Sequence, residues 1–376
     1  MSKKNDNRKS VVVVGGGGAG SEIARTLSGK LDPAQHSLTL ISERPFAIFL
    51  PASLRVVTTP DDTLEQNVQL TFDKLFINNN GTVVVGKVVA IENDKDAKSG
   101  DVVLDDGEKV HYDVLVLAPG SHWSGALAFP AGGKAEFHEH VVQWRKTFEN
   151  AKGVVLAGGG SVGIELAGEL RDLYPNKKIT LVHSDAKLLN AAYPDKFRTK
   201  AEQGMRTRNI DIVFGDYVDD FDAKGSITTR KGQKLEGDLV VPTYGARPAS
   251  EFVASLGSDT LTDRGHAKVR STLQLRAFDN IFAAGDILDW KEQKQLAKCR
   301  GHAAVIVANV LSILGGAAPA KEYKGSIEMI LVTNGKNGGV GYLDILWGIT
   351  LGNFIARLLK SKTLLIGEIQ SAYGLA

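Results

Sequence analysis

Two clusters of glycine have a spacing from which chemistry can be inferred. Each has the pattern G-x-G-x-x-G, formed by Gly15, Gly17 and Gly20 and again by Gly158, Gly160 and Gly163. In this pattern the first glycine permits a tight turn, the second lets the backbone approach a pyrophosphate, and the third allows close helix–strand packing. The helix that follows offers free N–H groups and the positive end of its dipole to a phosphate. Two dinucleotide-binding sites are therefore expected.

The same order of elements surrounds both clusters. An apolar, β-branched run precedes each cluster, at residues 11–14 and 153–157, and a helix-like stretch follows it. Each half then has a second apolar strand, a strand–turn–strand pattern and a last apolar strand opened by Asp113 or Asp238. This repetition predicts an α/β chain with two Rossmann-like dinucleotide-binding domains, and it argues against two glycine loops that bind nothing. A carrier that stays bound and one that exchanges would form a hydride relay, for which a flavin and a nicotinamide are the obvious pair.

Length and composition indicate which kinds of protein and of site this sequence can form. The chain has 376 residues, a formal charge of +2, 43% hydrophobic residues and 23% charged residues, which predicts a packed protein of two or three domains. Near-neutral charge argues against a broad nucleic-acid-binding face. Cys299 is the only cysteine, so the sequence excludes an internal disulfide, a Cys-x-x-Cys redox pair and a cysteine-rich metal site, and no metal is expected.

The N-terminus shows no targeting signal. It reads MSKKNDNRKS, without an apolar core and with Ser2 where myristoylation needs glycine, so a cytoplasmic, non-secreted protein is expected. Residues 303–320 contain no charge and approach the length of a membrane span. Because Asn309 and the pair Gly315 and Gly316 interrupt this run, a buried helix that ends at the glycine pair is predicted.

A second apolar stretch, residues 345–356, precedes three cations, Arg357, Lys360 and Lys362. It is too short to span a membrane, but its composition fits peripheral association with an intracellular membrane or a lipid droplet. It equally fits a contact between domains or within a homodimer. The sequence leaves these alternatives open.

Residues 280–286 read NIFAAGD and resemble the flavoprotein fingerprint in which a strand ends at Gly-Asp and the aspartate binds the ribityl chain of FAD. The strand at 112–121 resembles the segment that links the two nucleotide domains of such proteins. The resemblance implies an FAD domain split by an inserted NAD(P)H domain, with a small α+β C-terminal domain. The expected bounds are 1–122 and 249–318 for FAD, 123–248 for NAD(P)H and 319–376 for the C-terminal domain.

Four further segments resemble one branch of these flavoproteins. They are Pro51–Arg55 (PASLR), Gly301–Ala304 (GHAA), Asn334–Gly341 (NGKNGGVG) and Ala356–Lys362 (ARLLKSK). With them, nearly the whole chain resembles the AIF-like two-dinucleotide-binding flavoproteins, close to the ferroptosis suppressor proteins and more distantly the type II NADH dehydrogenases. The resemblance implies oxidation of NADH or NADPH by FAD, hydride transfer from nicotinamide C4 to flavin N5, and a quinone as acceptor. No cysteine pair follows the second strand, so the thiol-based mechanisms of this superfamily are excluded.

The resemblance also implies which residues form each site. For FAD they are Gly15, Gly17, Gly18, Ala19, Gly20, Glu43, Arg44, Arg55, Val88, Ala118, Pro119, Gly120, Gly285, Asp286, Lys298 and His302. For NAD(P)H they are Gly158, Gly160, Ser161, Val162, Gly163, His183, Ser184 and Gly245. The catalytic candidate is Glu165, which follows the second glycine cluster and would face the nicotinamide–flavin contact. A glutamate at a helix start is also favoured by the helix dipole alone.

The residues after each second strand bear on ribose recognition, because a carboxylate there binds ribose hydroxyls. Glu43 is the candidate in the first half, with a plain surface glutamate as the alternative. In the second half His183 and Ser184 occupy the place and no carboxylate would repel a 2′-phosphate, so use of both NADH and NADPH is expected. His183 as an ordinary histidine at a strand end is the alternative.

Two other functions share the double glycine pattern. One is a reductase for a ferredoxin-type protein partner, and the other is an AIF-like signalling or nucleic-acid-binding flavoprotein. The small net charge and the lack of a long Lys/Arg run count against nucleic acid as a partner.

Overall fold

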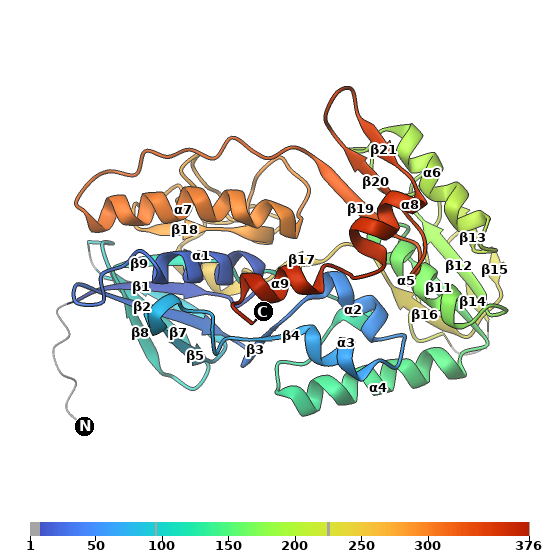
Figure 1. Ribbon diagram of the computed structural model, residues 1–376, viewed down its shortest axis with the longest axis horizontal. Coiled ribbons are helices and arrows are strands. Elements are labelled where there is room, and N and C mark those ends of the chain that lie inside the picture. The colour runs from blue at the N-terminus through green and yellow to red at the C-terminus, as the bar shows by residue number, and fades with distance from the viewer. Residues whose placement is uncertain (1–7, 95, 224–225, 376) are drawn as a thin grey trace.

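The computed structural model describes residues 8–94, 96–223 and 226–375. Its first sheet has five parallel strands in the order β18-β9-β1-β2-β5. Their bounds are Lys9–Val14 (β1), His36–Ser42 (β2), Thr82–Val85 (β5), Val114–Leu117 (β9) and Ile281–Ala283 (β18). β9 and the last four residues of β1 are buried, as expected for parallel strands covered on both faces. On one face α1 (Gly18–Ser28) lies beside α7 (Cys299–Leu314) (Figure 1).

The second sheet has four parallel strands in the order β13-β12-β11-β16. They are Gly153–Ala157 (β11), Lys178–His183 (β12), Asp211–Phe214 (β13) and Leu239–Pro242 (β16), and the helices are α5 (Ser161–Leu173) and α6 (Asp195–Arg206). Figure 1 shows this layer at the opposite end of the molecule from the first sheet. Since β18 follows the second sheet in the chain but pairs with β9, the chain leaves the first sheet and returns to it.

Short elements connect these layers. A three-stranded antiparallel sheet is formed by β6 (Val88–Asn93), β7 (Gly100–Leu104) and β8 (Lys109–Tyr112). Three antiparallel pairs join β3 (Phe46–Ile48) to β4 (Gln69–Thr71), β10 (Ser121–His122) to β17 (Arg247–Pro248), and β14 (Ile227–Thr228) to β15 (Lys234–Leu235). The connecting helices are α2 (Leu50–Val56), α3 (Asp62–Asn67) and α4 (Lys134–Asn150). The β10–β17 pair lies where the chain passes from one sheet to the other and back.

The C-terminal segment is a small α+β unit. The antiparallel strands β19 (Met329–Thr333), β20 (Gly339–Leu343) and β21 (Ile349–Leu351) precede α8 (Asn353–Ala356), a π-helical turn at Arg357–Ser361, and α9 (Ile366–Ala372). Figure 1 shows α9 returning toward α1, and a hydrogen bond from Gln370 Nε2 to Asn67 Oδ1 (3.1 Å) joins it to α3. The predicted α/β class with two Rossmann-like cores and a small C-terminal α+β segment is confirmed.

The uncharged run at 303–320 forms most of α7. The helix ends at Leu314 and Gly315 is its C-terminal cap, so the predicted helix that ends at the glycine pair is present. Among the residues that the structure describes, Leu296–Leu314 is the one stretch whose length and apolar composition would suffice to cross a membrane, and half of it is buried. Because α7 packs along α1, its apolar character is explained by the core.

Candidate dinucleotide-binding sites

The first glycine-rich turn joins β1 to α1. Gly15 has a φ of +107°, which disfavours a side chain, and a Cβ there would lie 2.1 Å from the carbonyl oxygen of Ala118. A Cβ on Gly20 would lie 1.8 Å from the carbonyl oxygen of Gly15, so the helix packs directly on the strand end. No atom lies within 4 Å of a Cβ on Gly17, which leaves this face of the backbone open to a ligand.

The start of α1 has free hydrogen-bond donors. Gly17 is the N-terminal cap, and no side chain caps the helix. Among the described residues, the N–H groups of Gly18, Ala19 and Gly20 therefore have no side-chain cap, and they lie at the positive end of the helix dipole. This arrangement can bind a pyrophosphate.

The second turn, between β11 and α5, repeats this geometry. Gly158 has a φ of +134°, and a Cβ on Gly163 would lie 2.0 Å from the carbonyl oxygen of Gly158. Nothing lies within 4 Å of a Cβ on Gly160, which caps α5 with no side-chain bond. Ser161 and Val162 form the first residues of this helix. The two turns thus match position by position.

The loop after β18 lies against the first turn. A Cβ on Gly285 would be 3.2 Å from Cβ of Ala19, and the Ser121 hydroxyl donates to Asp286 Oδ2 at 2.7 Å. Ser121 directly follows Ala118, Pro119 and Gly120, whose strand end borders Gly15. The structure therefore brings the first turn, the 118–120 strand end and Asp286 together, as a single extended ligand would require.

A buried polar chain supports the Gly285–Asp286 loop. The N–H of Gly285 donates to His302 Nδ1 (3.3 Å), and His302 Nε2 lies 2.9 Å from Glu292 Oε1. The hydroxyl of Tyr323 donates to Glu292 Oε2 at 2.7 Å. Burial alone would raise the pKa of Glu292, but the hydrogen bonds from His302 and Tyr323 outweigh it and hold that pKa below its usual value.

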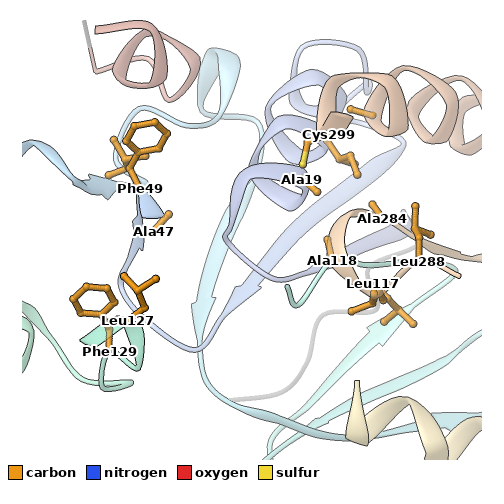
Figure 2. Close-up of a cluster of buried hydrophobic side chains, with 14 of the residues drawn as sticks. Ala19, Ala47, Phe49, Leu117, Ala118, Leu127, Phe129, Ala284, Leu288 and Cys299 are labelled. Atoms are coloured by element: carbon orange, nitrogen blue, oxygen red, sulfur yellow. The ribbon is translucent and has the colours of Figure 1, made fainter. Parts of the chain in front are cut away.

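Buried apolar side chains form two groups, one of which includes Ala19 at the start of α1. Figure 2 shows Ala47, Phe49, Leu127 and Phe129 in one group and Ala19, Leu117, Ala118, Ala284, Leu288 and Cys299 in another. Burial raises the pKa of the Cys299 thiol to about 12, so this cysteine is an unreactive thiol at neutral pH. An apolar environment of this kind suits a flat aromatic ring system.

Two of the predicted cationic residues are bound by carboxylates of the chain. Arg55 makes two 2.8 Å bonds to Glu169 of α5 and a 2.9 Å bond to the carbonyl oxygen of Ser361. Lys298 is 2% exposed and lies 2.6 Å from Glu328 Oε2. Both cations therefore join elements that are distant in the sequence, and their charges are already paired.

Three other predicted residues lie in or directly after strands β2 and β6. Arg44 donates to the carbonyl oxygens of Phe129 (2.7 Å) and Pro130 (2.6 Å), and burial lowers its pKa. Glu43 is exposed at the end of β2. Val88 lies in β6, outside the parallel sheet, where it pairs with Leu104.

His183 holds the second turn in shape. The N–H of Gly159 donates to its Nδ1 at 3.1 Å, and its Nε2 lies 3.3 Å from the carbonyl oxygen of Leu189. Both ring nitrogens are therefore occupied by the chain. Ser184 is exposed beside it, and Gly245 is exposed two positions after Thr243, whose hydroxyl donates to the Gly158 carbonyl oxygen at 2.8 Å.

Glu165 lies in the first part of α5 and is bound by the C-terminal segment. Its Oε1 accepts from the N–H of Thr333 (2.9 Å) and from Lys360 Nζ (2.7 Å). On the same helix Val162 and Leu166 line a narrow cleft that Leu54, Trp123 and Tyr244 complete, so both glycine-rich domains contribute to its walls. Glu165 is thus close to the junction of the two domains, and a lysine holds its position.

Sequence reasoning missed Ser121, Lys360 and Tyr373. Ser121 directly follows the predicted Gly120, and Lys360 lies in the ARLLKSK segment, so both had a local signal. Tyr373, which donates to the carbonyl oxygen of Gly16 at 3.2 Å, had none, because only the tertiary fold brings it to the first turn. Across the described ranges, no group of three or more His, Cys, Asp or Glu side chains could hold a metal ion.

Comparisons with known proteins agree with this geometry. Residues 9–304 match the family model described as pyridine nucleotide-disulphide oxidoreductase. The chain is 45% identical over 319 residues to the FAD-dependent oxidoreductase FVFD30 of Flammulina velutipes, covering 83% of this chain and 97% of that protein. It is 30% identical over 295 residues to ferroptosis suppressor protein 1 of Taeniopygia guttata, covering 75% of this chain and 76% of that one.

A solved structure shows the same fold. The sulfide:quinone oxidoreductase of Aquifex aeolicus superposes with a TM-score of 0.78 at 19% identity, over 97% of this chain and 92% of that chain. The predicted resemblance to the AIF-like flavoproteins is confirmed by the relatives. From the family match and the 45% identical relative, the chain belongs to the pyridine nucleotide-disulphide oxidoreductase family.

Proposed function

We propose that this protein is an FAD-dependent NAD(P)H oxidoreductase that passes electrons to a quinone. The observation that carries the proposal is the pair of glycine-rich turns with matching geometry, each followed by an uncapped helix. One turn has the Gly285–Asp286 loop beside it, which distinguishes the two sites. The 45% identical relative is named an FAD-dependent oxidoreductase, which supports FAD as the resident cofactor.

The first site is proposed for FAD, within a domain of residues 1–122 and 249–318. The N–H groups of Gly18, Ala19 and Gly20 would bind the pyrophosphate, and Asp286, held by Ser121, would accept hydrogen bonds from the ribityl hydroxyls. Glu43 would bind the ribose at the end of β2. When bound, FAD supplies the capacity to accept a hydride and to release two electrons.

The second site is proposed for NADH or NADPH, within residues 123–248. The turn at Gly158–Gly163 would bind the pyrophosphate, as in the first site. With His183 occupied by the backbone and no carboxylate before Asp185, two residues beyond β12, neither strong attraction nor repulsion of a 2′-phosphate is expected. Use of both donors follows.

Glu165 is proposed to orient the nicotinamide at the junction of the domains. Lys360 and the N–H of Thr333 fix one of its oxygens, so the carboxylate has little freedom of rotation. Proximity and orientation of the two reacting rings account for much of the rate of hydride transfer.

The quinone acceptor is supported by a set of exposed apolar side chains on the C-terminal segment, which we call the C-terminal apolar patch. Its most exposed members are Trp347 (101%), Phe354 (77%), Leu346 (75%) and Leu358 (67%). Leu346 and Trp347 have φ values of 46° and 69°, a strained conformation that holds them at the tip of the β20–β21 hairpin. Exposed Arg357 and Lys362 accompany them. Apolar side chains next to cations suit the interface of an anionic membrane, whose hydrocarbon core dissolves lipophilic quinones.

Acceptor competition tests this proposal. NADH oxidation is measured with a short-chain ubiquinone analogue, with a ferredoxin and without an added acceptor, alongside DNA binding. The proposal predicts fast turnover with the quinone, slow turnover with the ferredoxin and no DNA retention. Faster turnover with the ferredoxin would favour a protein partner and contradict the quinone assignment.

A further inference from the structure

The end of the chain lies against the first glycine-rich turn. Tyr373 is 3% exposed, and its hydroxyl donates to the carbonyl oxygen of Gly16 at 3.2 Å. Its ring stacks on Phe72, with centroids 6.5 Å apart and planes 29° apart. Phe72 packs closely against the glycine-rich turn, since a Cβ on Gly16 would lie 2.5 Å from Phe72 Cζ. One face of the turn is therefore covered by the C-terminus.

The same carbonyl oxygen has a second donor. The Ser21 hydroxyl donates to Gly16 O at 2.8 Å from within α1. Two buried hydroxyls thus hold one peptide group between Gly16 and Gly17. In a trans peptide the N–H points opposite to the C=O, so a carbonyl fixed toward Tyr373 turns the N–H of Gly17 away from Tyr373. A Cβ on Gly17 would meet no atom within 4 Å, so space for a ligand is present at this residue.

The second turn holds the equivalent peptide in another way. There the carbonyl oxygen of Gly159 accepts from the N–H of Leu189 at 2.9 Å, and Leu189 belongs to the same domain. The second turn therefore has a local support, whereas part of the support of the first turn comes from the last residues of the chain. This difference is the reason to assign Tyr373 a role.

Contacts further along the tail fix Tyr373 in place. Its N–H donates to the carbonyl oxygens of Ile369 and Gln370, and Gln370 Nε2 bonds Asn67. Gly374 has a φ of +72°, and a Cβ there would lie 2.6 Å from the carbonyl oxygen of Lys74. The tail is therefore a packed element. Burial raises the pKa of the Tyr373 hydroxyl, so it remains a donor over the working pH range.

We propose that Tyr373 is a positioning residue for the first dinucleotide site, and that the C-terminal tail retains the cofactor by orienting the Gly16–Gly17 peptide toward its pyrophosphate. This inference rests on the proposed assignment of FAD to that site. In this role the tail acts through the Gly16 carbonyl. Cofactor retention and the fold of the C-terminus are thereby linked.

The test uses Tyr373→Phe, which keeps the ring and removes only the hydroxyl. Apoprotein is prepared from the full chain, and its dissociation constant for FAD is measured by quenching of FAD fluorescence. A net hydrogen bond is worth about 1 kcal/mol, so FAD affinity should fall about five-fold. The Ser21 hydroxyl donates to the same carbonyl oxygen. The loss of FAD affinity in the double variant with Ser21→Ala should therefore exceed the product of the losses in the two single variants.

Two readouts separate positioning from general stability. The matched control is Tyr342→Phe, which removes a hydroxyl bonded to Asp344 (2.9 Å) in β20, at the other end of the molecule from the first turn (Figure 1). Both variants should lower the melting temperature of the apoprotein by similar amounts. Only Tyr373→Phe should weaken the binding of FAD. The binding of NADH to either apoprotein should be unchanged.

Unchanged FAD affinity in Tyr373→Phe, or equal weakening in Tyr342→Phe, would overturn the inference. If the wild-type apoprotein binds no FAD, the proposed function itself fails. If the wild-type protein binds FAD and the Tyr373→Phe variant binds it equally tightly, only the inference about Tyr373 fails.

Discussion

At the scale of single residues, Asp286 and Ser121 form the contact that best defines the first site. They are distant in sequence, and the 2.7 Å hydrogen bond between them fixes the carboxylate beside the turn. Asp286→Ala should lower FAD affinity by about ten- to a hundred-fold, because a bond to a charged group contributes about 1.5–3 kcal/mol. The ratio of flavin absorbance to protein absorbance after purification measures this loss.

Ser121→Ala serves as the milder companion variant. It leaves the carboxylate in place and removes only the group that orients it, so a loss of about five-fold is expected. An Asp286→Ala protein that purifies with full flavin would show that the first site is assigned incorrectly.

Glu165 is the second residue that carries a prediction. Glu165→Gln keeps the size of the side chain and an oxygen for Thr333 but removes the ion pair with Lys360. FAD content should be normal, while anaerobic flavin reduction by NADH should slow about ten-fold, or 1.4 kcal/mol. Stopped-flow absorbance at the flavin band measures the rate.

Glu169→Gln is the matched control for this variant. Glu169 lies one turn further along α5 and forms the buried pair with Arg55. Its loss should cost about 3 kcal/mol of folding stability without slowing flavin reduction in the folded protein. Equal rates in Glu165→Gln and wild type would leave Glu165 with a structural role only.

The sequence predicted the glycines of the two sites but not the partners of the charged residues. The glycines were predictable because tight turns and close backbone approach admit no other residue, and the structure shows the clashes that a Cβ would meet at Gly15 and Gly20. The partners of Arg55 and Lys298 were not predictable, since Glu169 and Glu328 come close only in the folded chain. The roles of all these residues toward cofactors remain predictions.

At the scale of elements, the two strand–turn–helix units offer a paired test. A Cβ would lie 1.8 Å from Gly15 O in Gly20→Ala and 2.0 Å from Gly158 O in Gly163→Ala, so each change should displace one helix from its strand. Gly20→Ala should lose FAD and keep NADH binding, whereas Gly163→Ala should keep FAD and lose NADH binding. FAD content and NADH titration measure the two losses, and each variant is the control for the other. Loss of FAD in Gly163→Ala alone would reverse the assignment.

The order of these elements could be predicted from the sequence, because the apolar runs and glycine clusters of both halves are local patterns. The return of β18 to the first sheet was expected from the resemblance and is present. The return of α9 to the first turn could not be predicted, because α9 is a short helix and its position depends on contacts such as that of Gln370 with Asn67.

At the scale of the whole molecule, the C-terminal apolar patch predicts where the protein meets its acceptor. Trp347→Ser with Phe354→Ser should reduce binding to vesicles containing anionic lipid, because each side chain loses about 2 kcal/mol of apolar burial. Co-sedimentation with such vesicles measures binding, and reduction of a water-soluble quinone should be unchanged.

Neutral vesicles provide the control for charge. If Arg357 and Lys362 contribute to membrane binding, the wild-type protein should bind neutral vesicles more weakly than anionic vesicles. Full vesicle binding by the double variant would contradict the membrane role, and a change from dimer to monomer in light scattering would assign the patch to contact between two copies.

The central claim concerns the relay between the two sites, and an anaerobic titration tests it most directly. The visible spectrum of the purified protein is recorded, NADH or NADPH is added, and a soluble ubiquinone analogue follows. The proposed function predicts flavin bands that bleach with either nicotinamide and return with the quinone. A colourless protein that cannot be reconstituted with FAD would contradict the assignment of the first site, and bands that bleach but do not return with quinone would contradict the acceptor.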